Sequence, residues 1–263
     1  MRIKMRAMNL ALAVAALAAP AVVLADGGKP VMLIKATTFD HGAFDKLLRA
    51  NVQDGKVDYA AFADSASFKA YVESLARIDT TSLGSADEKY AFWINAYNAL
   101  TIAGVLKHWP EIKSVKDPYP EFGFFKRALH RVGGKLISLD EIEHKILRAS
   151  FKDYRVHAAL NCASVSCPPL RPEAFVAKRL NAQLDEQFKA FARDTTRNVI
   201  DTTAGTVQLS AIFDWFKDDF AAKGGVAGVL AGVLDAPQAE AVKAATEAKK
   251  VTFVNYDWSL NKK

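Results

Sequence analysis

A long apolar helix pattern between residues 85 and 110 constrains the fold of this chain more than any other feature. Ser85 precedes the run as an N-cap, and Glu88 follows three positions later, at the spacing of a capping box. Pro110 ends the pattern because it lacks a backbone N–H. A helix that is apolar on most faces belongs in the interior of a domain. The sequence therefore predicts a helix over residues 90–109 that the other elements cover.

Shorter helices and hairpins are predicted on either side of this helix. Apolar residues at helical spacing predict helices over residues 39–52, 68–78, 139–148, 174–191, 210–220 and 224–234, and another from Pro237. Glycine-containing turn sequences predict a turn at Asp54-Gly55 and hairpins at Gly133-Gly134 and Ala204-Gly205. Residues 251–254 are predicted as a closing strand and residues 156–160 as a central strand.

Helices outnumber strands in this pattern, and the strands come partly as hairpins. The predicted class is therefore α+β: a helix-rich single domain with a small antiparallel sheet built partly from hairpins. No internal repeat and no linker divides the chain. We expect one globular domain over residues 39–261, preceded by a flexible lead-in over residues 26–38.

The first 25 residues have the pattern of a secretory signal peptide. Three of the first six residues are basic, an apolar run follows over residues 10–24, and small residues allow cleavage after Ala25. The alternative is an uncleaved anchor, but the run is short and contains Pro20. The sequence predicts a periplasmic or secreted protein with no stable membrane span after cleavage.

The charge of the chain is mildly basic. The formal net charge is +6, from 35 Lys and Arg against 29 Asp and Glu. Removing the three basic residues of the signal leaves 32 against 29, or +3. No dense basic stripe interleaved with aromatics accompanies this charge, so we expect no nucleic-acid partner. The expected partner is an unknown small molecule or peptide, and no cofactor is predicted.

Residues 157–170 hold both cysteines of the chain, Cys162 and Cys167, and one of its five histidines. In an oxidising compartment two cysteines indicate a possible disulfide. A reactive thiol is the second possibility, since a thiolate nucleophile needs a lowered pKa and a nearby base. A zinc site with His144 and His157, or two inert buried thiols, completes the alternatives.

Two histidines are close enough in sequence to serve as the base. On a strand, His157 and Cys162 are an odd number of positions apart and face opposite sides, so the loop must bend for them to meet. His144 comes from the preceding predicted helix and approaches from another direction. Glu143 can orient a histidine, whereas Glu141 suits a solvated first turn of that helix.

Asn95 and Asn98 lie three positions apart in the long helix and share one face. Their neighbours on that face are apolar, and an unpaired buried amide costs on the order of 1–3 kcal/mol. Either they orient a histidine or bind a substrate carbonyl, or they tie the helix to neighbouring backbone. In the tail, Asp257 can complete a Cys-His-Asp arrangement or simply form a turn.

Four blocks of this sequence together resemble a known family. The blocks are AFWINAYNAL at 91–100, SLDEIEHKILR at 138–148, HAALNCASVSCPPL at 157–170 and YDWSLN at 256–261. The chain is similar to the bacterial and plant family catalogued as domain of unknown function 547, over roughly residues 85–261. The resemblance implies family membership and carries no catalytic residue with it. The blocks that support the resemblance are also those selected above for their chemistry.

The sequence favours a thiol-dependent hydrolase or transferase that acts on an acyl or amide bond. Cys162 is the predicted nucleophile, with His157 or His144 as the base and Asn95 or Asn98 orienting the base or holding the oxyanion. The alternative is a non-catalytic periplasmic binding protein with a structural Cys162–Cys167 disulfide. In either case the predicted groove is lined by the aromatic residues Trp93, Tyr97 and Trp258.

Overall fold

The computed structural model describes residues 22–24 and 30–263 of the chain. The predicted signal peptide lies outside the described residues except for β1 (Val22–Leu24), which pairs antiparallel with β2 (Pro30–Met32). Farther along the predicted lead-in, Leu33 is buried and the Ile34 amide donates to the Arg77 carbonyl at 2.7 Å. This half of the lead-in is therefore attached to the domain rather than flexible.

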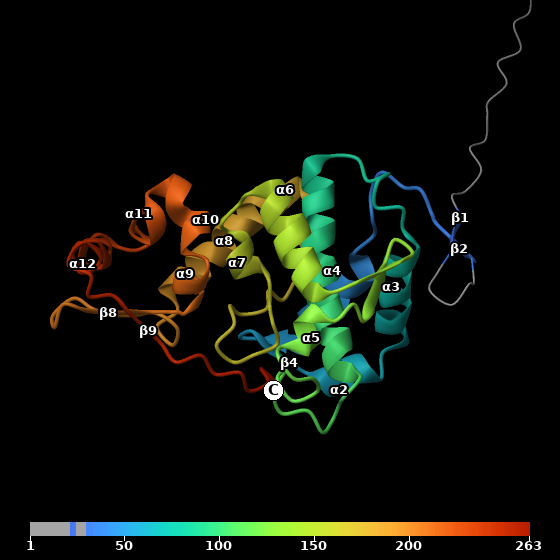
Figure 1. The fold of residues 1–263 in the computed structure, drawn as a ribbon, viewed down its shortest axis with the longest axis horizontal. Coiled ribbons are helices and arrows are strands. Elements are labelled where there is room, and N and C mark those ends of the chain that lie inside the picture. Colours follow the sequence, from blue (N-terminus) through green and yellow to red (C-terminus); the bar gives the residue numbers. More distant parts are fainter. Residues whose placement is uncertain (1–21, 25–29) are drawn as a thin grey trace, which may run out of the picture.

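The central helix α4 (Ala86–Leu106) confirms the prediction from the apolar run. The Ser85 hydroxyl accepts from the Glu88 amide at 3.1 Å, as expected of an N-cap. The Glu88 carboxylate accepts instead from the Phe39 amide at 2.9 Å, so the capping box is only half formed. Fourteen of the 21 residues of α4 are buried, and neighbouring helices surround it in Figure 1.

The elements around α4 come from residues 42–151. They are α1 (Gly42–Asn51), β3 (Val52–Gln53), β4 (Lys56–Val57), α2 (Tyr59–Ala63), α3 (Ala66–Arg77), α5 (Gly123–Lys126), β5 (His130–Val132), β6 (Lys135–Ile137), the π-helix η1 (Glu141–Arg148) and α6 (Ala149–Phe151). The predicted turn at Asp54-Gly55 and the hairpin at Gly133-Gly134 are both present, with positive φ angles at all four residues.

A second group of elements follows in the C-terminal part of the chain. They are η2 (Ala177–Arg179), α8 (Leu180–Arg193), β7 (Val199–Asp201), β8 (Thr206–Leu209), α9 (Ile212–Trp215), α10 (Lys217–Phe220), η3 (Ala221–Lys223), α11 (Gly225–Ala231), α12 (Ala236–Glu247) and β9 (Thr252–Phe253). Strands β7 and β8 form the predicted hairpin, and β9 adds to β8 in parallel, with Gln208 opposite Thr252.

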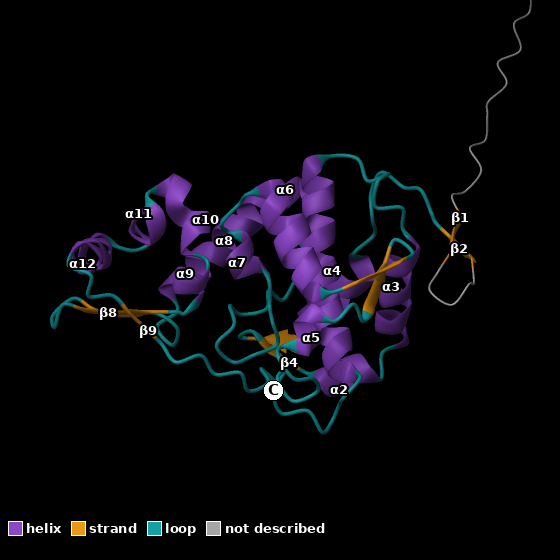
Figure 2. Ribbon diagram, in the orientation of Figure 1, coloured by secondary structure: helices purple, strands orange, loops and turns teal. Residues whose placement is uncertain are grey.

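The predicted α+β class is confirmed, and helices dominate the ribbon in Figure 2. The strands of the described residues are divided among four small sheets rather than gathered in one, and β8–β9 is a parallel pair. Within the same residues, no helix has the length and apolar character needed to cross a membrane.

The predicted central strand at residues 156–160 is wrong. Residues Val156–Ala159 form the one-turn helix α7, and only Leu160 is extended. A five-residue segment with four apolar residues fits a fully buried strand and a fully buried helical turn equally well. Here the turn is buried on all sides, because Val156 and Ala159 pack into the cluster around α4 while Ala158 packs into the second cluster. The loop that follows α7 therefore begins where the two clusters meet.

Candidate active site

The loop after α7 carries both cysteines as free thiols. The alternative of a Cys162–Cys167 disulfide therefore does not describe this structure. Cys162 is half-buried, Cys167 is 3% exposed, and the Cys162 amide donates to the Cys167 sulfur at 2.8 Å. The two side chains thus differ in their access to solvent while lying in one turn of the chain.

The backbone around Cys162 is held in an unusual shape. Ala163 has φ +64°, a left-handed conformation that is uncommon for a residue with a side chain. The Asn161 side chain supports it by accepting from the Ala163 amide at 3.0 Å. Pro169 closes the loop against the tight turn at Gly55, where a Cβ would lie 2.6 Å from the proline ring. Strained backbone directly beside a cysteine is a frequent feature of functional sites.

The chain segment at residues 256–263 returns to this loop from far along the sequence. The Val165 amide donates to the Ser259 carbonyl at 2.8 Å, and the Asn261 amide donates to the Ala163 carbonyl at 3.0 Å. In Figure 1 this red segment runs from β9 to the neighbourhood of β4. It brings the Tyr256 hydroxyl to 3.2 Å from the Cys162 sulfur, so the tail completes the environment of the thiol.

The Cys167 thiol and two hydroxyl groups lower the pKa of Cys162. Its sulfur lies 2.9 Å from the Ser164 hydroxyl and 3.2 Å from the Tyr256 hydroxyl. Burial alone would raise the pKa of Cys162, but hydrogen bonds from Cys167, Ser164 and Tyr256 outweigh it and lower the pKa to about 7. Burial and the neighbouring Cys162 sulfur raise the pKa of Cys167 well above its usual range. Cys162 is therefore the thiolate of the pair and Cys167 the protonated thiol.

A cavity of about 370 Å³ opens beside Cys162, between α4, η1, α5, α9 and the tail. Trp215, Tyr256 and Trp258 form a continuous aromatic wall, in which the two tryptophan rings stack with centroids 5.9 Å apart. Tyr97 also lines the cavity, as does Phe122, whose ring meets Trp258 edge to face at 5.0 Å. The wall is mainly apolar, as is usual for sites that bind small organic molecules.

The predicted groove residues are thus divided by the structure. Tyr97 and Trp258 line the cavity, whereas Trp93 does not. The Trp93 ring packs edge to face on Phe92, with centroids 5.2 Å apart, in the cluster around α4. The prediction of Trp93 as a groove residue is therefore wrong, whereas Tyr97 and Trp258 are found where it placed them.

His157 lies in the cavity wall with a defined tautomer. Its ring stacks on Phe216 with centroids 4.0 Å apart, and its Nε2 is 2.7 Å from an Asp219 carboxylate oxygen. Hydrogen bonds from His157 and Arg148 hold the pKa of Asp219 far below its usual range, so the carboxylate only accepts. Burial lowers the pKa of His157 more than the carboxylate raises it, so the ring is neutral. The network therefore assigns the proton to Nε2 and the lone pair to Nδ1.

His144 also lines the cavity, but its lone pair is already used. Arg148 holds Asp219 with two hydrogen bonds of 2.6 and 3.0 Å, and its third nitrogen lies 2.9 Å from His144 Nδ1. A guanidinium only donates, so His144 Nδ1 must accept from it. Neither His144 nor His157 hydrogen-bonds to the Cys162 sulfur, whose side-chain partners here are Ser164 and Tyr256. The predicted histidine–cysteine dyad is therefore not formed as a direct contact.

A carboxyl group stands in the same cavity. Tyr97 donates to Glu143 Oε2 at 3.2 Å, and burial raises the pKa of Glu143 despite the opposing effects of this hydrogen bond and of the Arg148 charge. Glu141 instead forms a reciprocal capping box with Ser138, with its amide 3.0 Å from the serine hydroxyl, and lies outside the cavity wall. Glu143 is therefore the acidic side chain of η1 that faces the site.

The two asparagines of α4 have structural rather than catalytic contacts. Asn95 binds both backbone groups of Phe175, donating to its carbonyl at 2.8 Å and accepting from its amide at 2.9 Å. Asn98 donates to the Ala159 carbonyl and accepts from the Asn161 amide, both at 2.9 Å. Neither lines the cavity. The alternative that they tie the helix to neighbouring backbone is therefore confirmed, the prediction that they contact a base or an oxyanion is wrong, and Asn98 positions the cysteine loop.

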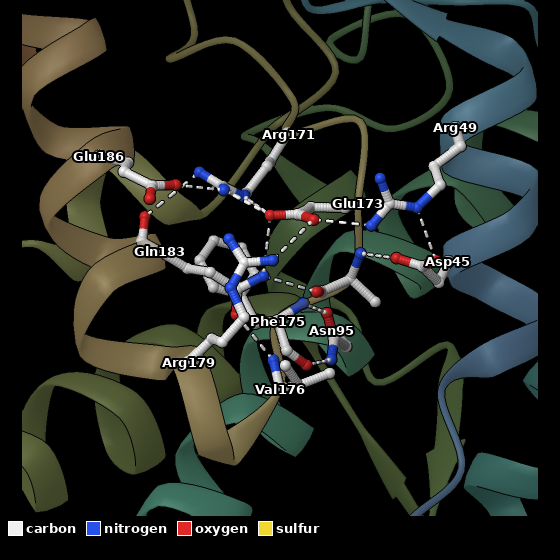
Figure 3. A network of polar contacts seen from close by, with 11 residues as sticks. Asp45, Arg49, Asn95, Arg171, Glu173, Phe175, Val176, Arg179, Gln183 and Glu186 are labelled. Atoms are coloured by element: carbon white, nitrogen blue, oxygen red, sulfur yellow. Dashed lines mark hydrogen bonds and ion pairs between the residues drawn. The ribbon is translucent and has the colours of Figure 1, made fainter.

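Asn95 also belongs to a polar network, which Figure 3 shows. Its centre is Glu173, which binds Arg49, Arg171, Arg179 and Gln183. Burial would raise the pKa of Glu173, but hydrogen bonds from Arg171, Gln183 and Arg49 lower it to about 2. None of these side chains lines the cavity, so the network ties α1, α4 and α8 together.

No metal site is formed by the residues of the zinc alternative. Throughout the part of the chain that the structure describes, no group of three or more His, Cys, Asp or Glu side chains could hold a metal ion. His157 is bound to Asp219 and His144 to Arg148, which leaves the two cysteines without histidine partners. Asp257 accepts from the Ser259 amide at 2.8 Å, which confirms its role as a turn former.

Several residues of the site were not predicted from the sequence. Asp219, Arg148, Phe216 and Ser164 have no motif or periodicity that links them to Cys162, and Asp219 is 62 residues from His157. Ser164 lies two positions from Cys162, and this short spacing between a hydroxyl and a thiol is the feature of the sequence that could have indicated their contact.

Comparison with known proteins supports the resemblance noted in the sequence. Residues 81–192 match the model of the family described as "Protein of unknown function, DUF547". This stretch contains α4, η1 and the cysteine loop, whereas Asp219 and Tyr256 lie beyond it. The chain matched no curated protein and no solved structure. The match supports the resemblance: over residues 81–192, the part that holds Cys162 and His157, the chain is similar to the DUF547 family.

Proposed function

We propose that the protein is a thiol-dependent hydrolase or transferase that acts on an acyl or amide bond, with Cys162 as its nucleophile. The observation that carries the proposal is the state of Cys162, a free thiol with a pKa of about 7 in the wall of an apolar cavity. A thiolate at neutral pH is the form that attacks carbonyl carbon. The aromatic wall suits a substrate with an apolar or aromatic acyl group.

Two further residues of the cavity supply the proton transfers. In the first step the Cys162 sulfur attacks the carbonyl carbon, the bond from that carbon to the leaving group breaks, and Glu143, whose pKa is raised by burial, gives the leaving group a proton. In the second step His157 Nδ1 takes a proton from the attacking water or acceptor alcohol or amine, whose oxygen or nitrogen bonds to the acyl carbon as the C–S bond breaks and the Cys162 thiolate leaves. The proton on His157 then returns to Glu143 through solvent water, which restores the starting state. Asp219 holds the ring in this tautomer and stabilises the imidazolium that forms.

The rival proposal of a binding protein stabilised by a structural disulfide has less support, because both thiols are free. The proposed location remains the periplasm or the cell exterior, on the basis of the N-terminal pattern. The proposed ligand is a small molecule or a peptide.

Reaction with 4-nitrophenyl acetate tests the nucleophile and the base separately. We expect a burst of 4-nitrophenolate equal to the enzyme concentration and an acetyl group on the peptide that contains Cys162. Cys162→Ser should abolish the burst, whereas Cys167→Ser should retain it. His157→Gln should keep the burst and make the acetyl adduct long-lived, because only the second step uses the base. His108→Gln, which changes a histidine outside the cavity, is the matched control.

Two results would contradict the proposal. An acetyl group found only on lysine or tyrosine would exclude Cys162 as the nucleophile. An adduct on Cys162 that decays equally fast in the wild type and in His157→Gln would exclude His157 as the base.

A further inference from the structure

Cys167 is a second thiol beside Cys162 that the proposed acyl transfer does not use. Its sulfur lies 2.8 Å from the Cys162 nitrogen and 3.7 Å from the Leu160 carbonyl oxygen. The path from the Cys162 Cα through its nitrogen to the Cys167 sulfur and on to the Cys167 Cα limits the Cα–Cα distance to about 7 Å. This distance is close to the range of Cα–Cα distances that a disulfide spans. The loop between them needs only side-chain and small backbone adjustments to bring the sulfurs together.

The two thiols differ in their exposure to small oxidants. Cys162 is half-buried and lines the cavity, and two hydroxyl groups hydrogen-bond to its sulfur. Cys167 also touches the cavity, but it is only 3% exposed. A hydroperoxide that enters the cavity therefore meets the Cys162 sulfur more readily, and thiolates are the form of cysteine that such oxidants attack.

We propose that Cys162 is a site of reversible oxidation by hydroperoxides and that Cys167 is its resolving thiol. The Cys162 thiolate attacks one oxygen of hydrogen peroxide, the O–O bond breaks, and hydroxide leaves and takes up a proton to become water. Cys162 is then a sulfenic acid. The Cys167 sulfur attacks the Cys162 sulfur, the S–O bond breaks, and a second water leaves with the Cys167 proton. Two thiols are thereby oxidised to a disulfide, and one peroxide is reduced to two waters.

This pairing gives the site a protected and inactive state. A cysteine without a resolving partner can be oxidised further to a sulfinic acid, and most proteins cannot reduce a sulfinic acid back to the thiol. The Cys162–Cys167 disulfide instead protects the Cys162 sulfur from further oxidation until a dithiol reductant restores both thiols. The inference shares with the proposed function only the Cys162 thiolate and does not depend on the acyl substrate.

Intact mass spectrometry of the full chain tests the inference. The reduced protein is treated with a small excess of hydrogen peroxide at neutral pH, quenched with catalase and alkylated with iodoacetamide. We expect both alkylation sites to disappear together, with a mass about 2 Da below that of the reduced protein, the two hydrogens of a disulfide. Dithiothreitol should restore both sites. Cys167→Ser should instead give a Cys162 sulfenic acid that dimedone traps and that proceeds to sulfinic acid.

The inference is overturned if wild-type Cys162 reaches sulfinic acid while Cys167 can still be alkylated, or if the disulfide forms only between chains. The wild-type time course gives this result even if Cys167→Ser fails to fold. The alkylation rate of Cys162 in the untreated sample separates the two proposals. Fast alkylation without disulfide formation removes only the resolving role of Cys167, whereas slow alkylation removes the nucleophile of the proposed function as well.

Discussion

Two hydroxyl groups, rather than an imidazole, contact the sulfur of Cys162. A neutral hydroxyl that donates to a thiolate stabilises it without forming an ion pair, so the acidity of Cys162 does not depend on the charge of a histidine. His157 is therefore free to remain neutral, which is the state in which it can accept a proton. In the proposed mechanism, lowering the pKa of the thiol and accepting a proton therefore fall to different residues.

Tyr256→Phe tests the contribution of one of these hydroxyls. The substitution removes the donor 3.2 Å from the sulfur and keeps the aromatic ring. A hydrogen bond to a charged group contributes about 1.5–3 kcal/mol, so the pKa of Cys162 should rise by about 1 unit or more. The pH dependence of iodoacetamide alkylation measures this shift. Tyr119→Phe, outside the cavity wall, should leave the profile in place, and an unchanged profile in Tyr256→Phe would show that the contact is unimportant.

Among the elements, α4 acts as the frame to which the site is attached. Asn95 binds the backbone of Phe175, at the start of the segment that leads into α8. Asn98 binds the Ala159 carbonyl at the end of α7 and the Asn161 amide at the start of the cysteine loop. An asparagine amide offers a donor and an acceptor in one plane, so it can replace a neighbouring peptide group in a hydrogen-bonded pair. This accounts for two polar residues on an otherwise apolar helix.

Substitution of Asn95 should lower stability without changing the thiol. Asn95→Ala leaves the amide and carbonyl of Phe175 without partners in a buried position, at a cost of about 2–4 kcal/mol in the free energy of unfolding. An ionised Asp in Asn95→Asp keeps the acceptor for the Phe175 amide but has no donor for the Phe175 carbonyl. A protonated Asp has an O–H donor, so only then should the free energy of unfolding lie between those of Asn95→Ala and the wild type. Urea unfolding measures the loss. A change in the alkylation profile of Cys162 at normal stability would instead indicate a role at the site.

The elements that the sequence predicted well are those with local signals. The cap at Ser85, the glycine turn at 133–134 and the amphipathic spacing of α8 are each contained within a few residues, and the structure has all three. The strand predicted at 156–160 failed because burial on every side removes the periodicity that separates strand from helix. Within the site, Cys162 was found from its residue type, but Asp219 and Tyr256 reach it only through tertiary folding.

At the scale of the whole molecule, buried histidines should control stability in mild acid. Burial lowers the pKa of His41 and of His130 to about 4, and burial also lowers the pKa of His157. The unfolded chain binds protons at these residues near pH 6.5, the ordinary histidine value, whereas the folded chain resists them down to about pH 4.

Stability should therefore be greatest above about pH 6.5 and fall as the pH decreases toward 4, because the unfolded state takes up more protons in this window. Each histidine contributes a slope on the order of 1 kcal/mol per pH unit. Urea unfolding at a series of pH values measures the slope. His130→Gln removes one of the histidines that bind a proton on unfolding, so it should make the slope shallower by the contribution of one histidine. A free energy of unfolding that is constant from pH 7 to 5 would contradict this account of the buried histidines.

The return of the tail to the cysteine loop has a consequence in time. Tyr256 is 94 residues beyond Cys162, and Asn261 bonds to Asn161 across 100 residues. At roughly 5–20 residues per second, a ribosome needs about 5–20 s to synthesise the intervening chain. During that interval the thiol exists without the hydroxyl and backbone partners that the tail supplies. The sulfur is made early, but it gains the Tyr256 partner that helps to lower its pKa only when the tail arrives, so the growing chain carries a less acidic cysteine until then.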